Sequence, residues 1–464
     1  MAANSGDTIK VLEDLNLTEE VVIDTDKVIN INLNGKTITS TSNNTINNKG
    51  TLTITGNGII KNEVENGVVI YNTGILNIEN GVITTTANGG KAVFNDNSNG
   101  TFEDTYKKPQ DFMKAFIKKS NECKGSFNMK GGKIVTEGIG SIGIYNVNNS
   151  VSVVTGGIIE TRNYASKGVY NDSTFGIENA KVIISDEDSI VIYNANAAKS
   201  CIIKESEITV EAEEIEDYEL IKNTDQFKEE LEKMKPSYGI YNDSDSEVLV
   251  ETATIKVERL KGVGIFNNAK GTITLGYDES IDDENIELDT ASPIVYAIAD
   301  NTTSIINSKE GKINFYDGKV LTKTSIKNII TDVLKNYEIY EELSSNIIST
   351  TLRLIEETSG AASEKSQETE SSSESKDVVN SETNSNTGDK SNDNTKTTDV
   401  STPSQNVESD EKDTSNQENG SSEESNVKPV ESTESAENGN KSANENSSIE
   451  TDGSNESVQQ GSDK

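Results

Sequence analysis

The sequence has no His and no Trp, and it has only two Cys and three Arg among its 464 residues. Two Cys make no disulfide framework, and a Cys nucleophile would lack the His that normally activates it. The formal net charge is −37. Nucleic-acid phosphates are bound by clustered Lys and Arg, so this composition excludes a nucleic-acid partner and disfavours adsorption to anionic lipid.

Long apolar runs are also missing. No stretch of 18 apolar residues occurs in the sequence, so we predict no membrane span. Residues 1–10 do not show the charged region followed by an apolar region that marks a signal peptide. We therefore expect the protein either to be cytosolic or to have lost a leader.

Aromatic residues are missing from the last part of the chain. Residues 357–464 contain no Phe, Tyr or Trp, and they carry 25 acidic and 8 basic side chains, a net charge of 8 − 25 = −17. Such a segment cannot bury enough apolar surface to offset the entropy of ordering. We predict that residues 357–464 form a disordered acidic tail rich in Ser, Glu, Asn and Thr.

What residues 1–356 do contain is a repeat, the first feature to seek in such a chain. A phrase of an aliphatic residue, an aromatic residue and Asn recurs every 23 to 25 residues, with two steps of about double length that contain insertions. The clear copies end at Asn72, Asn95, Asn146, Asn171, Asn194, Asn242 and Asn267. We interpret Ile46-Asn47-Asn48 as a degenerate first copy and Val295-Tyr296-Ala297 as a degenerate last copy.

Two further phrases complete each repeat. The second alternates apolar and other residues, which is typical of a strand with one buried face. Its apolar pairs are Leu52/Ile54, Leu76/Ile78, Phe127/Met129, Val151/Val153, Phe175/Ile177, Cys201/Ile203, Val248/Val250 and Ile273/Leu275. The third phrase places a small residue two positions before an aliphatic one, as in Gly58 and Ile60. Because Cys201 occupies an apolar position of the second phrase, we expect a buried free thiol there.

Three short strands per repeat, separated by Asn, Gly and Asp, predict one turn of a triangular coil. No repeat can bury its apolar side alone, so the coils must stack with equivalent strands parallel and about 4.8 Å apart. The predicted fold class is all-β, a single-stranded parallel β-helix solenoid of eight or nine coils. We expect Ile and Val to pack as ladders inside it and the Asn amides to bond along the stack.

The domain organisation follows from the repeat. We predict an N-terminal cap and first coil at 1–44, the parallel β-helix at 45–324 and a C-terminal cap at 325–356, for which the pattern leaves helix and strand open. Insertions near 103–124 and 212–236 show helical spacing. The spaced residues are Phe112, Ala115 and Phe116 in the first insertion, and Phe227, Leu231 and Met234 in the second.

Each inserted helix has two possible roles. It either lies on the rod and covers apolar surface, or it shapes a binding cleft, because insertions in repeat proteins often sit on the working face. In the second insertion, Asn223 and Gln226 are placed like a capping box at a helix N-terminus.

Three segments carry a resemblance to a known family: residues 70–78, Gly81-Val82-Ile83 and residues 313–318. They resemble right-handed parallel β-helix surface proteins of low-GC Gram-positive bacteria, within the pectate-lyase-like superfamily. The acidic tail resembles the wall-spanning stalks of such proteins. The resemblance implies an extracellular or cell-surface location, although the sequence shows neither a signal peptide nor a Leu-Pro-x-Thr-Gly sorting motif.

The resemblance also raises the question of catalysis, because some members of the superfamily are polysaccharide lyases or hydrolases. Lyases of that kind are expected to use a basic side chain as proton acceptor, with calcium held by acidic residues. Arg162 and Arg259 are the Arg residues of the coils, and each stands alone at a predicted strand end. Hydrolysis needs two carboxylates about 5 to 9 Å apart, which an acidic solenoid supplies by chance.

Calcium is a separate, weaker possibility. Oxygen-rich turns bind calcium, and the acidic turns are Asp186-Glu187-Asp188, Asp243 with Asp245 and Glu247, and residues 278–289. None matches a known calcium-loop spacing. We assign no catalytic, cofactor-binding or metal-binding residue.

The aromatic residues of the first phrase should stack in one column, which we call the aromatic ladder. It comprises Tyr71, Phe94, Tyr145, Tyr170, Tyr193, Tyr241 and Phe266. A small residue often precedes the aliphatic one, as in Gly143 and Gly168, and the period of two places small and aromatic residues on one face. We favour aliphatic residues inside and rings outside, an arrangement that serves either as structure or as a platform for sugars or a partner.

These observations predict a non-enzymatic extracellular surface protein, an adhesin or a structural stalk that presents a β-helix on a flexible spacer. The alternatives are a carbohydrate-active enzyme or a glycan-binding module on the same fold. The expected partner is a host or environmental glycan or protein, and the chain is expected to be monomeric.

Overall fold

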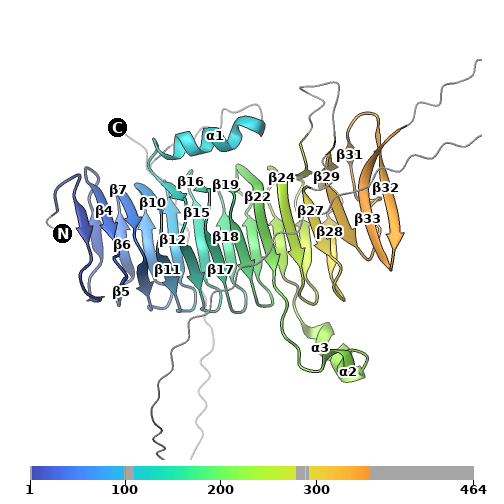
Figure 1. Ribbon diagram of the computed structural model, residues 1–464, viewed down its shortest axis with the longest axis horizontal. Helices are drawn as coiled ribbons and strands as arrows, with labels where there is room; N and C mark the ends of the chain where they lie inside the picture. The colour runs from blue at the N-terminus through green and yellow to red at the C-terminus, as the bar shows by residue number, and fades with distance from the viewer. Residues whose placement is uncertain (1–2, 99, 101–108, 278–287, 289–291, 356–464) are drawn as a thin grey trace, which may run out of the picture. The chain divides into compact units, whose positions relative to one another are not determined.

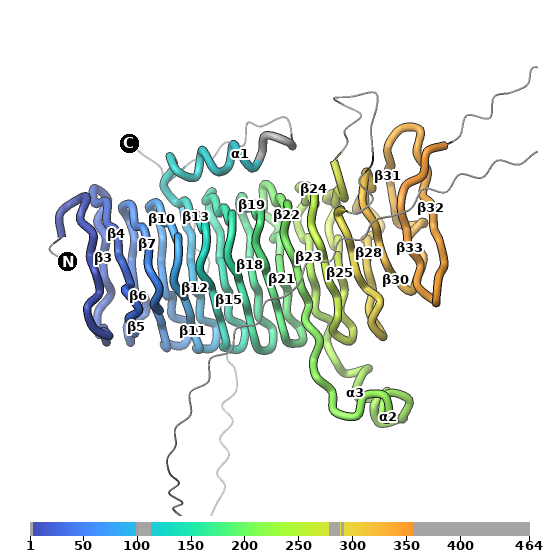
Figure 2. The backbone as a smooth tube through the Cα atoms, viewed as in Figure 1, coloured from blue at the N-terminus to red at the C-terminus, as the bar shows by residue number. Residues whose placement is uncertain are grey.

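The computed structural model is a parallel β-helix, as the repeat predicts (Figure 1). It describes residues 3–98, 100, 109–277, 288 and 292–355. Within this part the chain winds through successive coils, and each coil contributes one strand to each of three parallel rows (Figure 2). One row forms a separate ten-stranded sheet, sheet B, and the other two belong to sheet A.

Sheet B contains the aliphatic–aromatic–Asn phrases, all in register. Its strands are β3 (Val21–Ile23), β6 (Asn44–Asn48), β9 (Val68–Asn72), β12 (Lys91–Asp96), β15 (Ile142–Val147), β18 (Lys167–Asn171), β21 (Ile190–Asn194), β23 (Tyr238–Asn242), β25 (Val263–Asn267) and β28 (Thr303–Asn307). Ile46-Asn47-Asn48 is confirmed as an early copy, because Asn48 pairs with Asn72. An even earlier coil pairs Ile23 with Asn48.

The predicted last copy was wrong. Val295-Tyr296-Ala297 belongs to β27 (Ile294–Ala297), which lies in sheet A with Val295 opposite Ile255. The true last copy is Ile305-Ile306-Asn307 in β28, where Asn307 pairs with Asn267. The repeat pattern does not reveal this copy because Ile306 stands where the other copies have an aromatic residue. Sheet B therefore has ten strands, more than the eight or nine coils predicted.

Sheet A holds the second and third phrases in two rows. The first row contains β1 (Thr8–Lys10), β4 (Val28–Asn32), β7 (Thr51–Thr55), β10 (Ile75–Ile78), β13 (Ser126–Met129), β16 (Val151–Val154), β19 (Thr174–Glu178), β26 (Thr272–Leu275), β29 (Lys312–Phe315) and β31 (Asp332–Val333). The second contains β2 (Leu15–Leu17), β5 (Lys36–Ser40), β8 (Gly58–Asn62), β11 (Val82–Thr85), β14 (Lys133–Thr136), β17 (Ile158–Thr161), β20 (Lys181–Ile184), β27 and β30 (Lys319–Thr322). Two long strands, β22 (Ser200–Val210) and β24 (Glu247–Val257), run through both rows.

Between the rows lies a continuous apolar core. One cluster of buried residues extends from Val11 to Leu352 and includes Cys201, as predicted. Beside it runs the predicted Asn ladder, in which each Nδ2 donates to the Oδ1 of the next coil over 2.7–3.0 Å. The ladder runs from Asn48 to Asn307. Asn48 Oδ1 is buried without a donor among the described residues because the preceding coil has Ile23 at this position.

The inward face of β16 differs from the prediction by one residue. Ser152 and Val154 align with the core residues Phe127 and Met129, so Val151 and Val153 point outward. A shift of one residue exchanges the two faces of a strand. The alternation of apolar residues in the sequence could not distinguish the two faces of β16, because both are buried. Ser152 faces inward because its hydroxyl donates to Asn146 Oδ1 at 2.7 Å.

The small position of sheet B also points inward, which overturns the prediction that it shares a face with the rings. A Cβ on Gly143 would lie 2.5 Å from the carbonyl oxygen of Gly168 in the next coil and 2.9 Å from Ile159 Cγ2. Where this position holds Val69, the side chain is fully buried. The period of two fails here because the pairing of β15 with β18 skips this residue.

The first insertion carries helix α1 (Pro109–Ser120), which lies on the outer face of sheet A. Met113 and Phe116 pack there with Val151, Val153, Ile202 and Leu249 in a cluster separate from the core. The close fit depends on Gly176, where a Cβ would lie 2.7 Å from Met113 Sδ. The first of the two roles, covering apolar surface, is therefore confirmed for α1. The side chain of Phe112 lies outside the described residues.

The segment left open between helix and strand is a strand hairpin. Strands β32 (Tyr337–Ser344) and β33 (Ile347–Leu354) pair antiparallel, and β33 pairs antiparallel with β30. Leu352 closes the core at this end. At the other end, β1 and β4 pair in parallel like the coils that follow.

The second insertion contains α2 (Tyr218–Ile221) and α3 (Asp225–Lys233). The predicted capping box was wrong: Thr224, not Asn223, caps α3 by accepting a hydrogen bond from the backbone N–H of Phe227 at 3.2 Å. Gln226 instead donates to Glu230 at 3.1 Å. Phe227, whose N–H bonds to this cap, is the buried residue of α3.

Candidate functional site

The aromatic ladder is the most extended candidate site, and its rings stand on the outer face of sheet B. The aliphatic residue before each ring, such as Ile144 before Tyr145, is fully buried, whereas the rings are half-buried. The prediction of aliphatic residues inside and rings outside is confirmed. Successive ring centroids from Tyr71 to Phe266 lie 4.7 to 5.4 Å apart.

The packing of the rings decides what they offer to a ligand. Their interplanar angles run from 38° to 78°, within the tilted and edge-to-face arrangements that stabilise aromatic pairs. At this spacing each ring covers much of the faces of its neighbours. A ligand therefore meets a strip of ring edges and Tyr hydroxyl groups rather than a series of open ring faces.

Acidic groups line one side of the ladder. The Tyr71 hydroxyl donates to Asp96 at 2.9 Å, and the Tyr193 hydroxyl donates to Asp243 at 3.0 Å. Burial, together with the bond to Asp96, raises the pKa of Tyr71 to about 12, and the same causes raise the pKa of Tyr193. These hydroxyl groups stay protonated at any physiological pH and act as fixed donors.

Two Lys residues accompany the ladder. Lys91 lies 5.8 Å from the ring centroid of Tyr145, and Lys167 lies 5.8 Å from that of Tyr193. Both ammonium groups interact with the negative face of the ring. Burial lowers the pKa of each. The ladder thus combines apolar edges, hydroxyl groups and charges of both signs on one face.

Arg162, the first candidate base, is held in ion pairs on the surface. Its Nε donates to Glu160 at 2.6 Å, and its Nη1 lies 3.0 Å from Glu137. The bond to Glu160 is the main cause of a raised pKa for Arg162. A proton acceptor must lose its own proton first, so this environment opposes the role of a base.

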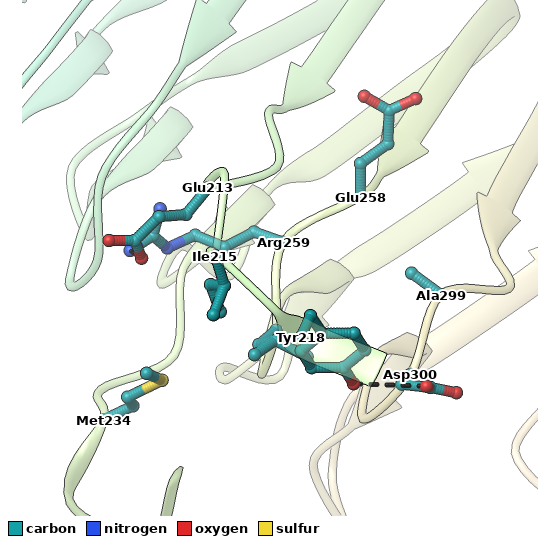
Figure 3. A pocket seen from close by; sticks show the side chains of 9 residues that line it. Glu213, Ile215, Tyr218, Met234, Glu258, Arg259, Ala299 and Asp300 are labelled. Carbon is teal, nitrogen blue, oxygen red and sulfur yellow. Dashed lines mark hydrogen bonds and ion pairs between the residues drawn. The ribbon is translucent and has the colours of Figure 1, made fainter. Parts of the chain in front are cut away.

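The prediction that Arg259 stands alone at a strand end was wrong. Arg259 lies in the wall of a hollow of about 250 Å³ at the base of the second insertion. Its side chain is only 5 % exposed. The guanidinium donates to the Ser185 carbonyl at 3.2 Å and to Glu213 at 2.7 Å. Figure 3 shows Arg259 and Glu213 together at one end of the hollow, with Tyr218 and Asp300 at the other.

The other walls of the hollow come from separate segments. Apolar contacts come from Ile215 and Met234 of the insertion and from Leu260 and Ala299 of the coils. The Tyr218 hydroxyl donates to Asp300 at 3.1 Å, the bond drawn in Figure 3. Asp300 also pairs with Lys323 at 2.6 Å, and these two bonds lower its pKa.

The acidic turns proposed for calcium are engaged with donors of the protein. Asp188 pairs with Lys235 at 3.0 Å, and Glu187 accepts the Lys235 backbone N–H at 2.9 Å. Asp243 accepts from Asn268 at 2.9 Å as well as from Tyr193. The described residues hold no group of three or more His, Cys, Asp or Glu placed to bind a metal ion. Residues 278–287 and 289–291 lie outside the described part.

No family model, no curated protein and no solved structure matches this chain significantly. Among the residues that the structure describes, no helix combines the length and apolar character needed to cross a bilayer.

Sequence reasoning recognised the ladder but missed the hollow. The ladder repeats at a fixed interval, whereas the hollow joins Glu213, Tyr218, Arg259 and Asp300 from three separate parts of the chain. One signal was present: Arg259 lies two residues after the end of a strand in a chain with three Arg, and an Arg that is buried there requires partners.

Proposed function

We propose that this chain is a non-enzymatic extracellular surface protein of the adhesin or stalk type, whose β-helix binds an extended glycan or protein ligand through the outer face of sheet B. The observation that carries the proposal is the aromatic ladder, a continuous half-buried strip across seven coils. The surface location and the relationship to pectate-lyase-like proteins of Gram-positive bacteria are part of the same proposal, and both rest on the sequence resemblance.

The chemistry of the strip supports binding along its length. Ring edges bury apolar area, and Tyr and Lys side chains supply directional contacts at low conformational cost once they are packed. Tyr193 and Lys167 are already held by their neighbours, so a ligand would not have to order them. The ion pairs of Arg162 favour binding over lyase chemistry.

A binding array tests the proposal. The full chain is applied to immobilised glycans and matrix proteins, and soluble glycans are incubated with it in parallel to detect cleavage. We expect saturable binding without product release. Tyr170→Ala should weaken binding about tenfold, as for an aromatic residue at the centre of an interface.

Tyr340→Ala provides the matched control. Tyr340 is an exposed Tyr of the C-terminal hairpin, outside the ladder, and contacts Arg353. Equal loss of binding in the Tyr170 and Tyr340 variants would contradict a role of the ladder. Release of shortened glycans would instead favour the alternative, a carbohydrate-active enzyme.

A further inference from the structure

The two insertions attach to the coils in different ways. Helix α1 is seated by buried Met113 and Phe116. In contrast, within the described residues of the second insertion α2 has no buried residue and α3 has only Phe227, which packs on Tyr218 at 5.7 Å. Figure 1 shows α2 and α3 standing away from the stacked strands. The second insertion therefore does not serve to cover apolar surface of the sheets.

Polar contacts hold the second insertion at its base. Arg259 pairs with Glu213, the Tyr218 hydroxyl donates to Asp300, and Lys261 Nζ donates to the carbonyl oxygens of Glu232 and Met234 at 3.0 and 2.8 Å. Most of the residues that make these contacts also line the hollow of about 250 Å³; they are Glu213, Tyr218, Met234, Arg259 and Asp300. The insertion thus keeps a hollow open at its base, although apolar side chains are available to close it.

The hollow has an apolar interior and an acidic surround. Ile215, Met234, Leu260 and Ala299 supply aliphatic walls. Charge can be counted over the lining and its direct ion-pair partners. Four carboxylates stand against three cations, an excess of one negative charge; they are Asp186, Glu213, Glu258 and Asp300 against Lys222, Arg259 and Lys323.

The wider surroundings have the same sign. Residues 212–236 carry nine acidic and four basic side chains, a net charge of 4 − 9 = −5. Glu258 is exposed, and no ion pair to it is found among the described residues. An acidic surface of this kind attracts a basic partner and repels an acidic one.

We propose that this hollow is a docking site for a basic segment of a partner protein, and that one Lys or Arg side chain of the partner enters it. Lys and Arg combine an aliphatic stem with a charged head. The stem fits the aliphatic walls, and the head reaches the carboxylates at the rim.

This site differs from the aromatic ladder in its residues and in its ligand. The ladder offers ring edges and hydroxyl groups along sheet B, whereas the hollow selects positive charge. Loss of one activity therefore leaves the other in place, and the two proposals are tested by different variants.

The test is the binding of a fluorescein-labelled tetralysine peptide to the full chain, measured by fluorescence anisotropy. The salt concentration is roughly 0.15 M, where exposed charges more than about 8 Å apart are largely screened. Ala299→Leu fills the hollow without a change of charge. It should weaken binding at least about fivefold, because the Leu side chain occupies the space of the aliphatic stem of the peptide's Lys. Glu258→Gln should weaken binding about threefold through the loss of one rim charge.

Glu65→Gln is the matched control. Glu65 is exposed and lies in the turn between β8 and β9, which corresponds to the turn between β24 and β25 that carries Glu258. It removes the same charge and should leave binding unchanged. Glu258 is itself exposed, so its variant tests the proposal even if Ala299→Leu impairs folding.

Three outcomes would overturn the proposal. The first is unchanged binding in a folded Ala299→Leu protein. The second is an equal loss in the Glu65 and Glu258 variants, which would assign binding to net charge alone. The third is equally tight binding of a labelled tetraglutamate peptide.

Discussion

Removal of one amide from the middle of the Asn ladder should destabilise the rod far more than removal of one at its end. Asn171 is fully buried. Its Nδ2 donates to Asn194 Oδ1 at 2.8 Å, and its Oδ1 accepts from Asn146 Nδ2 at 2.9 Å and from the Ser173 backbone N–H at 3.2 Å. Ala at this position deletes all of these bonds.

The magnitude follows from the groups that lose their partner. Asn146 Nδ2 keeps its bond to the Thr174 carbonyl at 2.8 Å, so it remains satisfied. Asn194 Oδ1 and the Ser173 N–H each lose their donor or acceptor inside the protein. Because a buried unsatisfied group costs about 1–3 kcal/mol, Asn171→Ala should lower the free energy of unfolding by about 2–6 kcal/mol.

Asn307→Ala is the comparison at the end of the ladder. Asn307 is half-buried, and Asn267 Nδ2 keeps its bond to the Gly271 carbonyl at 2.9 Å without it. We expect a loss of about 1 kcal/mol. Urea unfolding of the full chain, followed by circular dichroism and Tyr fluorescence, measures both variants, and agreement of the two probes checks two-state behaviour. If the two variants lost the same free energy of unfolding to within about 0.5 kcal/mol, the reasoning that buried amides in the middle of the ladder contribute more than those at its end would be refuted.

Three further predictions concern single side chains. Phe116→Ala should detach α1 without unfolding the strands, because the cluster that holds α1 is separate from the core. Amide hydrogen exchange in residues 113–120 should become about a hundredfold faster, which corresponds to a loss of roughly 3 kcal/mol in the local stability of α1. A large fall in the Tm of the strands would contradict this. Burial raises the pKa of Cys201 to about 12, so iodoacetamide at pH 8 should modify one thiol, half-buried Cys123, in the native chain and two in denaturant. Burial opposes ionisation of Glu207, but the bonds from Lys181 and Lys256 outweigh it and lower its pKa to about 2. This stabilisation is present above the unfolded pKa of about 4.3 and is lost as pH falls toward 2; Glu207→Gln should therefore lower Tm at pH 7 but hardly at pH 2, and an equal effect at both values would contradict the ion pairs.

The sequence by itself determined the coil, the three rows and the Asn ladder. A stack of equivalent strands requires the same residue type at the same place in every coil, so each structural demand appears as a visible period, from Asn48 to Asn267. The outward direction of the rings was predictable for the same reason: Ile70 and its equivalents supply a complete aliphatic interior.

Only the tertiary structure decided the features that break the period. Val151 and Val153 face outward because α1 covers them, and Val295 belongs to sheet A because of its partner Ile255. The hollow arises where Glu213 meets Arg259 across 46 residues of sequence. Such contacts depend on how an insertion meets the coils, which no local pattern records, and the candidate docking site is built from them.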